Sequence, residues 1–243
     1  MFIISRKRIS LILICFLIGI SVYSYQGMKT GTQEKVEDTI EEATATPVSG
    51  KVVVLDAGHG TPDEGAQSSK GTTEAETNLK IALKVQNLLE QSGCTVILTR
   101  SDEKAIYDLD KTTLKEKKIS DIRNRVKIGN SASADMFVSI HLNKIPQQQY
   151  WGWQCFYSSK SEESMKLAKI LQSSLNDAIQ KDNKRVAMKL DTVYIMKHVE
   201  IPISIVECGF LSNPEEEQQL LDDEYQDKLA WGIYNGIIEY FKN

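Results

Sequence analysis

The sequence predicts a single α/β domain over residues 50–243, with a mostly parallel, twisted sheet flanked by helices on both faces. Two observations predict this fold class. First, the segments "KVVVLDA" (51–57) and "ISIVECGF" (203–210) are largely apolar without alternation, as strands buried on both faces are. Second, such segments alternate along the chain with segments that carry apolar residues at helical spacing, an order typical of parallel sheets covered by helices.

A helix is predicted after the first strand. Residues 74–93 place Ile81, Val85 and Leu88 on one face, and Gly93 is expected to end the helix as its C-cap. A helix with one apolar face packs that face against the sheet, so this segment is expected to cover one side of the domain.

The next segments predict two strands around a second helix. A second buried strand is expected at "CTVILTR" (94–100), and the charged stretch 101–118 is expected to be a loop. A helix capped by Ser120 is predicted over 120–131. The segment "ADMFVSIHLN" (134–143) then predicts a third strand.

The second half of the domain continues the alternation. Strands are predicted at 152–158 and 203–210, and helices at 161–181 and 225–241. The residues of these two helices that are expected to face the core are Met165, Ala168, Leu171, Leu175, Ala178, Leu229, Ile233, Ile237 and Phe241.

The N-terminal residues 1–25 predict a signal peptide or an N-terminal membrane anchor. The basic sequence "SRKR" (5–8) precedes an uncharged apolar run at 9–22. A cleavage site of the A-x-A type is missing, which favours an uncleaved anchor. Positive charge on the N-terminal side predicts that this end lies in the cytoplasm and that the rest of the chain works outside it, in the cell envelope. Residues 26–49 lack an apolar period and are expected to be a linker.

The charge of the chain argues against nucleic acid as a partner. The full chain has 29 Lys and Arg against 33 Asp and Glu, a net charge of −4. Residues 1–25 hold three of the basic residues and no acidic residue, so the remainder has 26 against 33, a net charge of −7. Proteins that bind nucleic acid neutralise phosphates with clustered basic residues, so no such partner is expected.

The cysteines predict neither a disulfide framework nor a cysteine zinc site. Cys15 lies in the apolar N-terminal run, which leaves Cys94, Cys155 and Cys208, an odd number without C-x-x-C spacing. Buried free thiols are therefore expected.

Chemistry-bearing residues stand at the carboxyl ends of three predicted strands. His59 follows the first strand, His141 lies near the end of the third, and Glu207 lies near the end of the last. In open α/β sheets the carboxyl ends of parallel strands meet at one edge, where ligands bind. Each residue alone has an ordinary explanation, because a histidine can hydrogen-bond within a turn and a glutamate can pair with lysine or arginine. Their equivalent positions favour a shared site.

These residues predict a zinc site that has an acid/base group beside it. Two histidines and one further ligand would leave a fourth position of zinc open, as catalytic sites do. Glu74, in the first turn of the first helix, is the expected third ligand, and Glu76 is the alternative. Glu207 is then free to accept and return a proton during amide hydrolysis.

Other polar and aromatic residues are weaker candidates for substrate binding. Arg125, Asn143 and Trp153 are the candidates, although a structural role is the usual explanation for Arg125 and Asn143. Trp151 and Trp153 flank Gly152 and could together offer a stacking surface for a sugar, whereas aromatic residues in strands usually belong to the core. His198 has no comparable neighbours and is expected to lie on the surface or in packing.

With these residues in view, the chain resembles the zinc-dependent N-acetylmuramoyl-L-alanine amidases of the amidase type 3 family. The matching segments, in order, are "LDAGHGTPDEGAQ" (55–67), "GTTEAETNLKIA" (71–82), "VILTRSD" (96–102), "RVKIGNSASADMFVSIHLN" (125–143) and "VECGFLSNPEEE" (206–217). Several ordered segments are far more specific than one motif. Ala57 and Thr61 replace the proline and glycine that are usual in the loop after the first strand.

The resemblance implies an activity and assigns the site residues. It implies hydrolysis of the amide between the lactyl group of N-acetylmuramic acid and the L-alanine of the stem peptide. One Zn²⁺ per chain would be held by His59, Glu74 and His141, and Glu207 would be catalytic. The family spacing Glu-x-x-x-Asn-Leu selects Glu74, because Asn78 and Leu79 follow at that distance.

Within the family, the chain looks most like the germination-specific spore-cortex amidases of endospore formers. These take part in forming the muramic-δ-lactam of the cortex. The expected partners are then peptidoglycan as substrate, the membrane through the N-terminal segment, and an accessory protein that supports zinc binding or activity. The alternatives that remain are a zinc peptidase of the stem peptide and a noncatalytic module that binds muropeptides.

Overall fold

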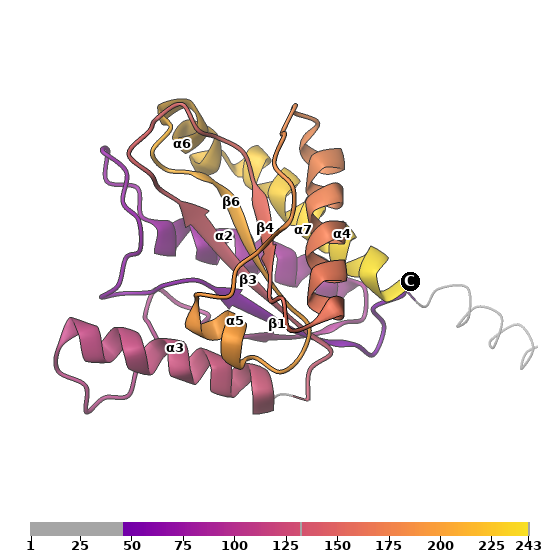
Figure 1. Ribbon diagram of the computed structural model, residues 1–243, viewed down its shortest axis with the longest axis horizontal. Helices are drawn as coiled ribbons and strands as arrows, with labels where there is room; N and C mark the ends of the chain where they lie inside the picture. Colours follow the sequence, from indigo (N-terminus) through magenta and orange to yellow (C-terminus); the bar gives the residue numbers. More distant parts are fainter. Residues whose placement is uncertain (1–45, 132, 243) are drawn as a thin grey trace, which may run out of the picture. The chain divides into compact units, whose positions relative to one another are not determined.

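The computed structural model describes residues 46–131 and 133–242 (Figure 1). The signal peptide or anchor predicted for 1–25, and the linker as far as residue 45, lie outside the described residues. The strands are β1 Val52–Ala57, β2 Thr95–Leu98, β3 Met136–Asn143, β4 Gln154–Tyr157, β5 Met188–Lys189 and β6 Ile203–Phe210. The helices are α2 Glu74–Gln91, α3 Leu114–Ser131, α4 Glu162–Ile179, α5 Tyr194–His198, α6 Pro214–Leu221 and α7 Asp223–Lys242.

The six strands form one sheet in the order β2-β1-β3-β6-β4-β5. The neighbours β2, β1, β3 and β6 are parallel, whereas β4 runs antiparallel to β6. The prediction of a mostly parallel sheet is therefore confirmed. Because β4 runs the other way, its first residues lie at the edge of the sheet where β3 and β6 end.

Helices cover both faces of the sheet, as predicted (Figure 1). On one face, α2, α4 and α7 pack over inward residues such as Val53 and Leu55 of β1. On the other face, α3 and α5 pack over a smaller apolar cluster that includes Val54 and Phe137. Successive residues of β1 thus serve opposite cores, which explains why its sequence is apolar without alternation.

Helix α3 begins at Leu114, six residues before the predicted start at Ser120. The side chains of Thr113 and Glu116 each accept a hydrogen bond from the other residue's backbone N–H, at 3.2 and 3.0 Å. This reciprocal pair is a capping box, which satisfies amide groups at the start of the helix. Ser120 lies inside the helix, and its hydroxyl donates a hydrogen bond to Asp108. The first turns of α3 are lysine-rich and exposed, so no apolar period marks them.

Three further differences concern the burial of β2, the core positions of α4 and three short elements. Strand β2 is an edge strand and is only partly buried, because β1 covers one side of it alone. Within α4, Met165 and Ala178 are partly buried, while the core positions are Leu167, Ala168, Leu171, Leu175 and Ile179. The sequence does not predict the short elements β5, α5 and α6, because segments of this length contain too few residues to show an apolar period.

The described residues begin at Thr46, inside the segment 26–49 that the sequence predicts to be a linker. Val48 is fully buried and belongs to the larger core cluster. A single apolar residue in a polar segment gives no periodic signal, which is why the sequence places it in the linker. The free, buried state of Cys94, Cys155 and Cys208 agrees with expectation. Within the described part of the chain, no helix has the length and apolar character needed to cross a membrane.

Candidate metal centre and active site

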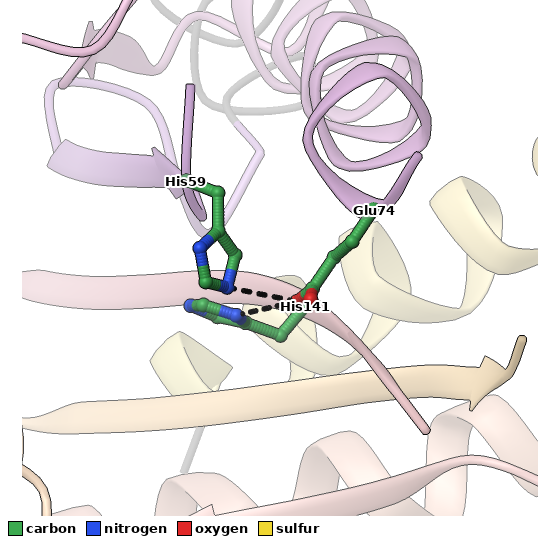
Figure 2. A group of neighbouring side chains, drawn as sticks. All are labelled: His59, Glu74 and His141. Carbon is green, nitrogen blue, oxygen red and sulfur yellow. Dashed lines mark hydrogen bonds and ion pairs between the residues drawn. The ribbon is translucent and has the colours of Figure 1, made fainter. Parts of the chain in front are cut away.

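Three side chains from three elements converge at the carboxyl end of the sheet. His59 follows β1, Glu74 is the first residue of α2, and His141 lies in β3 (Figure 2). Oε1 of Glu74 lies 3.3 Å from Nε2 of His59 and 2.9 Å from Nδ1 of His141. One ligand atom from each residue lies within 4.8 Å of the others, which makes the three a possible metal-binding group.

The donor set of this group fits zinc. Two imidazole nitrogens and one carboxylate oxygen are ligands that Zn²⁺ takes in catalytic sites. Nδ1 of His59 is engaged by Oδ2 of Asp63 at 3.0 Å, which leaves Nε2 to face the group. Oε2 of Glu74 accepts a hydrogen bond from the backbone N–H of Ala66 at 2.8 Å. Such outer partners orient metal ligands in zinc sites.

The charges around His59 and Glu74 keep the group ionised. Burial lowers the pKa of His59, but hydrogen bonds with Asp63 and Glu74 outweigh burial and raise this pKa to about 9. Burial raises the pKa of Glu74, but hydrogen bonds from His141 and His59 outweigh it and hold the pKa well below its usual range. A metal cation bound here would supply the positive charge that the proton on His59 supplies without it.

Two glycines leave space for the ligands. A side chain on Gly58 would collide with the ring of His141. A Cβ atom on Gly65, which has φ +68°, would lie 2.5 Å from Oε2 of Glu74 and 2.7 Å from the ring of His59. The glycines of "GHGTPDEG" therefore allow the loop to pass close to the site.

The backbone of the His59 loop is held through its carbonyl groups. His59 has a left-handed backbone with φ +62°, which is unfavourable for a residue other than glycine. The carbonyl of Ala57 accepts hydrogen bonds from both Arg100 and Arg125, at 2.9 and 2.7 Å. Arg100 also donates to the carbonyl of Gly58 at 3.1 Å, and Arg125 donates to the carbonyl of His59. Three consecutive carbonyls are thus fixed by two arginines.

Arg125 lines the pocket and also holds the loop that carries His59, so substrate binding by Arg125 stays a prediction. Its side chain is 3% exposed and pairs with Asp56 at 2.6 Å and with Asp121 at 2.8 Å. Burial lowers the pKa of Arg125, but these two carboxylates outweigh burial and hold the pKa above its usual range. With its guanidinium committed to two carboxylates and two carbonyls, Arg125 has little capacity left for a ligand.

Glu207 lies beside the group, on the neighbouring strand. It pairs in register with His141 across β3 and β6. Its Oε2 atom is buried without a hydrogen-bond partner within the described residues. Burial, supported by the negative charge of Glu74, raises the pKa of Glu207 to about 7, although both histidines oppose the shift. A carboxyl group with a pKa near neutrality suits general acid/base chemistry.

A pocket of about 260 Å³ opens at this group. Lys118 lies 3.1 Å from Asp63 in this pocket. The polar and charged side chains that line the pocket are those of Asp56, His59, Asp63, Lys118, Asp121, Arg125, His141 and Glu207. The apolar residues that line the pocket are Ile122, Leu190, Val193, Ile195 and Ile205. A lining of apolar residues with a few polar groups among them is typical of small-molecule and substrate sites.

The remaining candidates lie elsewhere. Trp153 is fully buried in the core, and its Nε1 donates to Asn176 at 2.8 Å, which corrects the expectation that it binds substrate. Asn143 ends β3, two residues beyond His141, and is partly buried. His198 is exposed and stacks on Tyr194, as a surface residue would. Glu76 is exposed and pairs with Lys80, so only Glu74 joins the histidines.

Sequence reasoning missed the residues that support the site. Asp63, Arg100, Asp56 and Asp121 hold the ligands or the loop that carries His59. Arg100 lies two residues after the end of β2, so the rule that functional groups collect at strand ends could have singled it out. Asp63 follows His59 by four residues in the same loop, a spacing that suits a carboxylate contact with the imidazole.

The comparisons with known proteins agree with this geometry. Residues 53–239 match the Amidase_3 family, described as N-acetylmuramoyl-L-alanine amidase. The chain belongs to this family. It is 40% identical over 195 residues to the germination-specific N-acetylmuramoyl-L-alanine amidase of Bacillus subtilis (strain 168), a match that covers 80% of this chain and 81% of the relative.

Solved structures of the same family share the fold. The CwlD amidase from Clostridioides difficile, solved in complex with the GerS lipoprotein, has 42% identity and a TM-score of 0.77 over 79% of this chain and 98% of that one. The catalytic domain of CwlV, an N-acetylmuramoyl-L-alanine amidase from Bacillus (Paenibacillus) polymyxa var. colistinus, has 32% identity and a TM-score of 0.67 over 79% and 98%. The expected family, α/β fold and enzyme class of this amidase domain are therefore confirmed.

Proposed function

We propose that this amidase is a zinc enzyme that cleaves the amide between the lactyl group of N-acetylmuramic acid and the L-alanine of the stem peptide. Membership of the family supports the substrate class. The observation that carries the zinc-dependent reaction is the position of Glu207, whose unpartnered Oε2 is buried beside the His59, Glu74 and His141 group. One carboxyl group next to a metal site can serve as both base and acid.

In the proposed mechanism, His59, Glu74 and His141 hold one zinc ion. When bound, zinc supplies Lewis acidity that activates water and polarises a carbonyl oxygen. Glu207 takes a proton from the attacking water as its oxygen bonds to the lactyl carbonyl carbon. The C–N bond then breaks, and Glu207 returns the proton to the departing amine of L-alanine. The products are a lactyl carboxylate on the glycan and a peptide with a free N-terminus.

The remaining residues position these groups. The pair of Asp63 with Nδ1 of His59 fixes the nitrogen that faces the ion. Burial shields the carboxyl group of Glu207 from water, which keeps the pKa of Glu207 near neutrality. Arg100 and Arg125 hold the loop between β1 and His59.

Analysis of digestion products tests the reaction. Purified peptidoglycan treated with the enzyme should release peptides that begin at L-alanine and should retain intact glycan strands, as mass spectrometry can show. A zinc peptidase of the stem peptide would instead leave L-alanine attached to the glycan. A noncatalytic module that binds muropeptides would release nothing.

We also propose a role for this chain in the maturation of spore cortex. The similarity to a germination-specific relative, across most of both chains, supports this proposal. Removal of the stem peptide exposes the lactyl carboxylate, which muramic-δ-lactam formation requires. Spores that lack this protein should therefore contain cortex without muramic-δ-lactam and should fail to complete germination. Normal muramic-δ-lactam in such spores would refute this role.

An extracytoplasmic location and an accessory protein are proposed on separate grounds. The sequence of residues 1–25 supports anchoring to the membrane, with the amidase domain in the envelope. A structural relative was solved in complex with a lipoprotein, which supports an accessory protein for this chain. The accessory role predicts that the chain purified alone binds zinc substoichiometrically; a fully loaded and active lone chain would contradict it.

A further inference from the structure

Two exposed aromatic side chains lie at the edge of the sheet that carries the active site. Tyr150 and Trp151 precede β4, and their exposed fractions are 46% and 39%. Because β4 is antiparallel to β6, this segment lies near the end of β6, beyond Glu207. The guanidinium of Arg185 lies over the ring of Tyr150, 6.0 Å from its centre. We call Tyr150, Trp151 and Arg185 the aromatic platform.

The backbone beneath the platform is fixed by hydrogen bonds. Nε of Arg185 donates to the carbonyl of Trp151 at 3.0 Å, and the backbone N–H of Gly152 donates to the buried side chain of Glu216 at 2.8 Å. The side chain of Asn213 donates to the carbonyl of Tyr150 at 3.4 Å. Residues 150 and 152 are thus bonded to the start of α6, and residue 151 to Arg185. A ligand that uses this platform would meet a surface that is already ordered.

Gln154 lies between the platform and Glu207. Nη1 of Arg185 donates to Oε1 of Gln154 at 3.1 Å. Gln154 is the register partner of Glu207 across β4 and β6. Residues directly opposite on neighbouring strands point to the same face, with Cβ atoms roughly 5 Å apart. The platform is therefore continuous with the catalytic edge and does not stand apart from it.

We propose that the aromatic platform is a subsite for the saccharide strand of peptidoglycan. This inference rests on the proposed function. A pyranose ring has C–H faces that pack on aromatic rings and hydroxyl groups at its rim that bond to guanidinium and amide groups. Tyr150 and Trp151 supply the rings, while Arg185, held in place by the buried Gln154, supplies the polar partner. The subsite would bind sugar units next to the muramic acid whose amide reaches Glu207.

A peptide-free sugar tests the subsite without requiring turnover. The full chain should bind a tetramer of N-acetylglucosamine in a calorimetric titration, and Tyr150→Ala with Trp151→Ala should weaken this binding about fivefold or more. Trp231→Ala provides the matched control, because Trp231 is 49% exposed on α7. Its substitution should leave the affinity unchanged. No binding by the wild type, or equal binding by the platform variant, would overturn the proposal.

Kinetics identify which part of the substrate the platform contacts. On long glycan strands that carry stem peptides, the platform variant should raise KM about fivefold with little change in kcat. On a single muramyl peptide both constants should stay unchanged. An equal rise in KM on both substrates would mean that the platform binds the stem peptide, and would overturn a saccharide subsite. A wild type that binds the tetramer but cleaves no peptidoglycan would refute the proposed function alone.

Discussion

Nδ1 of His59 lies 3.0 Å from Oδ2 of Asp63, four residues further along the same loop. This contact decides which nitrogen of His59 faces Glu74 and His141. Lys118 lies 3.1 Å from the other oxygen of Asp63 and helps to keep that carboxylate charged. Burial raises the pKa of Asp63, but His59 and Lys118 outweigh it and lower this pKa to about 2. Asp63 therefore stays ionised as the outer partner of a metal ligand.

Loss of the Asp63 carboxylate should weaken zinc binding. Asp63→Ala frees the ring of His59 to rotate and removes the charge that supports it. We expect about 10- to 100-fold lower zinc affinity, the usual cost of losing an outer partner, measured by competition with a chromogenic chelator. Glu64→Ala is the control on the same loop. Unchanged zinc affinity in Asp63→Ala would show that His59 is oriented by other contacts.

Loss of a direct metal ligand should strongly reduce zinc binding relative to the wild type. Glu74→Gln removes the carboxylate that contacts both histidines, whereas Glu76→Gln changes an exposed residue that pairs only with Lys80. Metal analysis of the purified variants should find zinc strongly reduced in Glu74→Gln and retained in Glu76→Gln. The reverse result would place the third ligand at the alternative position.

Arg125 should matter for stability more than for substrate affinity. Arg125→Ala leaves Asp56 and Asp121 without their cation in a buried site, which typically costs about 3–5 kcal/mol of the free energy of unfolding. Arg123→Ala, at an exposed position of the same helix, should change it by less than about 0.5 kcal/mol. Urea unfolding measures both. A stable Arg125→Ala with raised KM would favour the substrate-binding role.

The ionisation of Glu207 should destabilise the zinc-free protein at high pH. Its pKa is raised from 4.5 to about 7 in the folded protein, so the unfavourable charge develops as pH rises from 4.5 through 7. Glu207→Gln cannot ionise, and we expect it to be more stable than the wild type by roughly 1–3 kcal/mol at pH 8 and little different at pH 4. Thermal unfolding at both pH values tests this. A difference that does not vary with pH would contradict it.

The strand ends explain how much of the site the sequence could predict. His59, His141 and Glu207 each follow a recognisable apolar strand, and parallel strands bring their carboxyl ends to one edge. The contribution of Arg100 and Arg125 is harder to predict, because their partners are backbone carbonyls, which leave no trace in the side-chain pattern. The alternation of strands and helices predicts a mostly parallel sheet, but it does not predict the order of the strands within the sheet.

The two tryptophans show where local backbone geometry overrides a sequence pattern. Residues two apart in a strand share a face, so Trp151 and Trp153 are expected to point the same way. Gly152 between them has φ +96°, a left-handed conformation that breaks this alternation. Trp153 is consequently buried, while Trp151 is exposed next to Tyr150. The start of α3 is a similar case, since its capping box lies in a charged segment without an apolar period.

The most direct test of the proposed reaction compares wild type with Glu207→Gln on purified peptidoglycan, with zinc content measured in the same samples. We expect the wild type to release peptides that begin at L-alanine. Glu207→Gln should retain the same zinc content as the wild type and lose turnover by about 100-fold or more, the usual range for an acid/base group. Full activity in Glu207→Gln, or products cut within the stem peptide, would contradict the proposed mechanism.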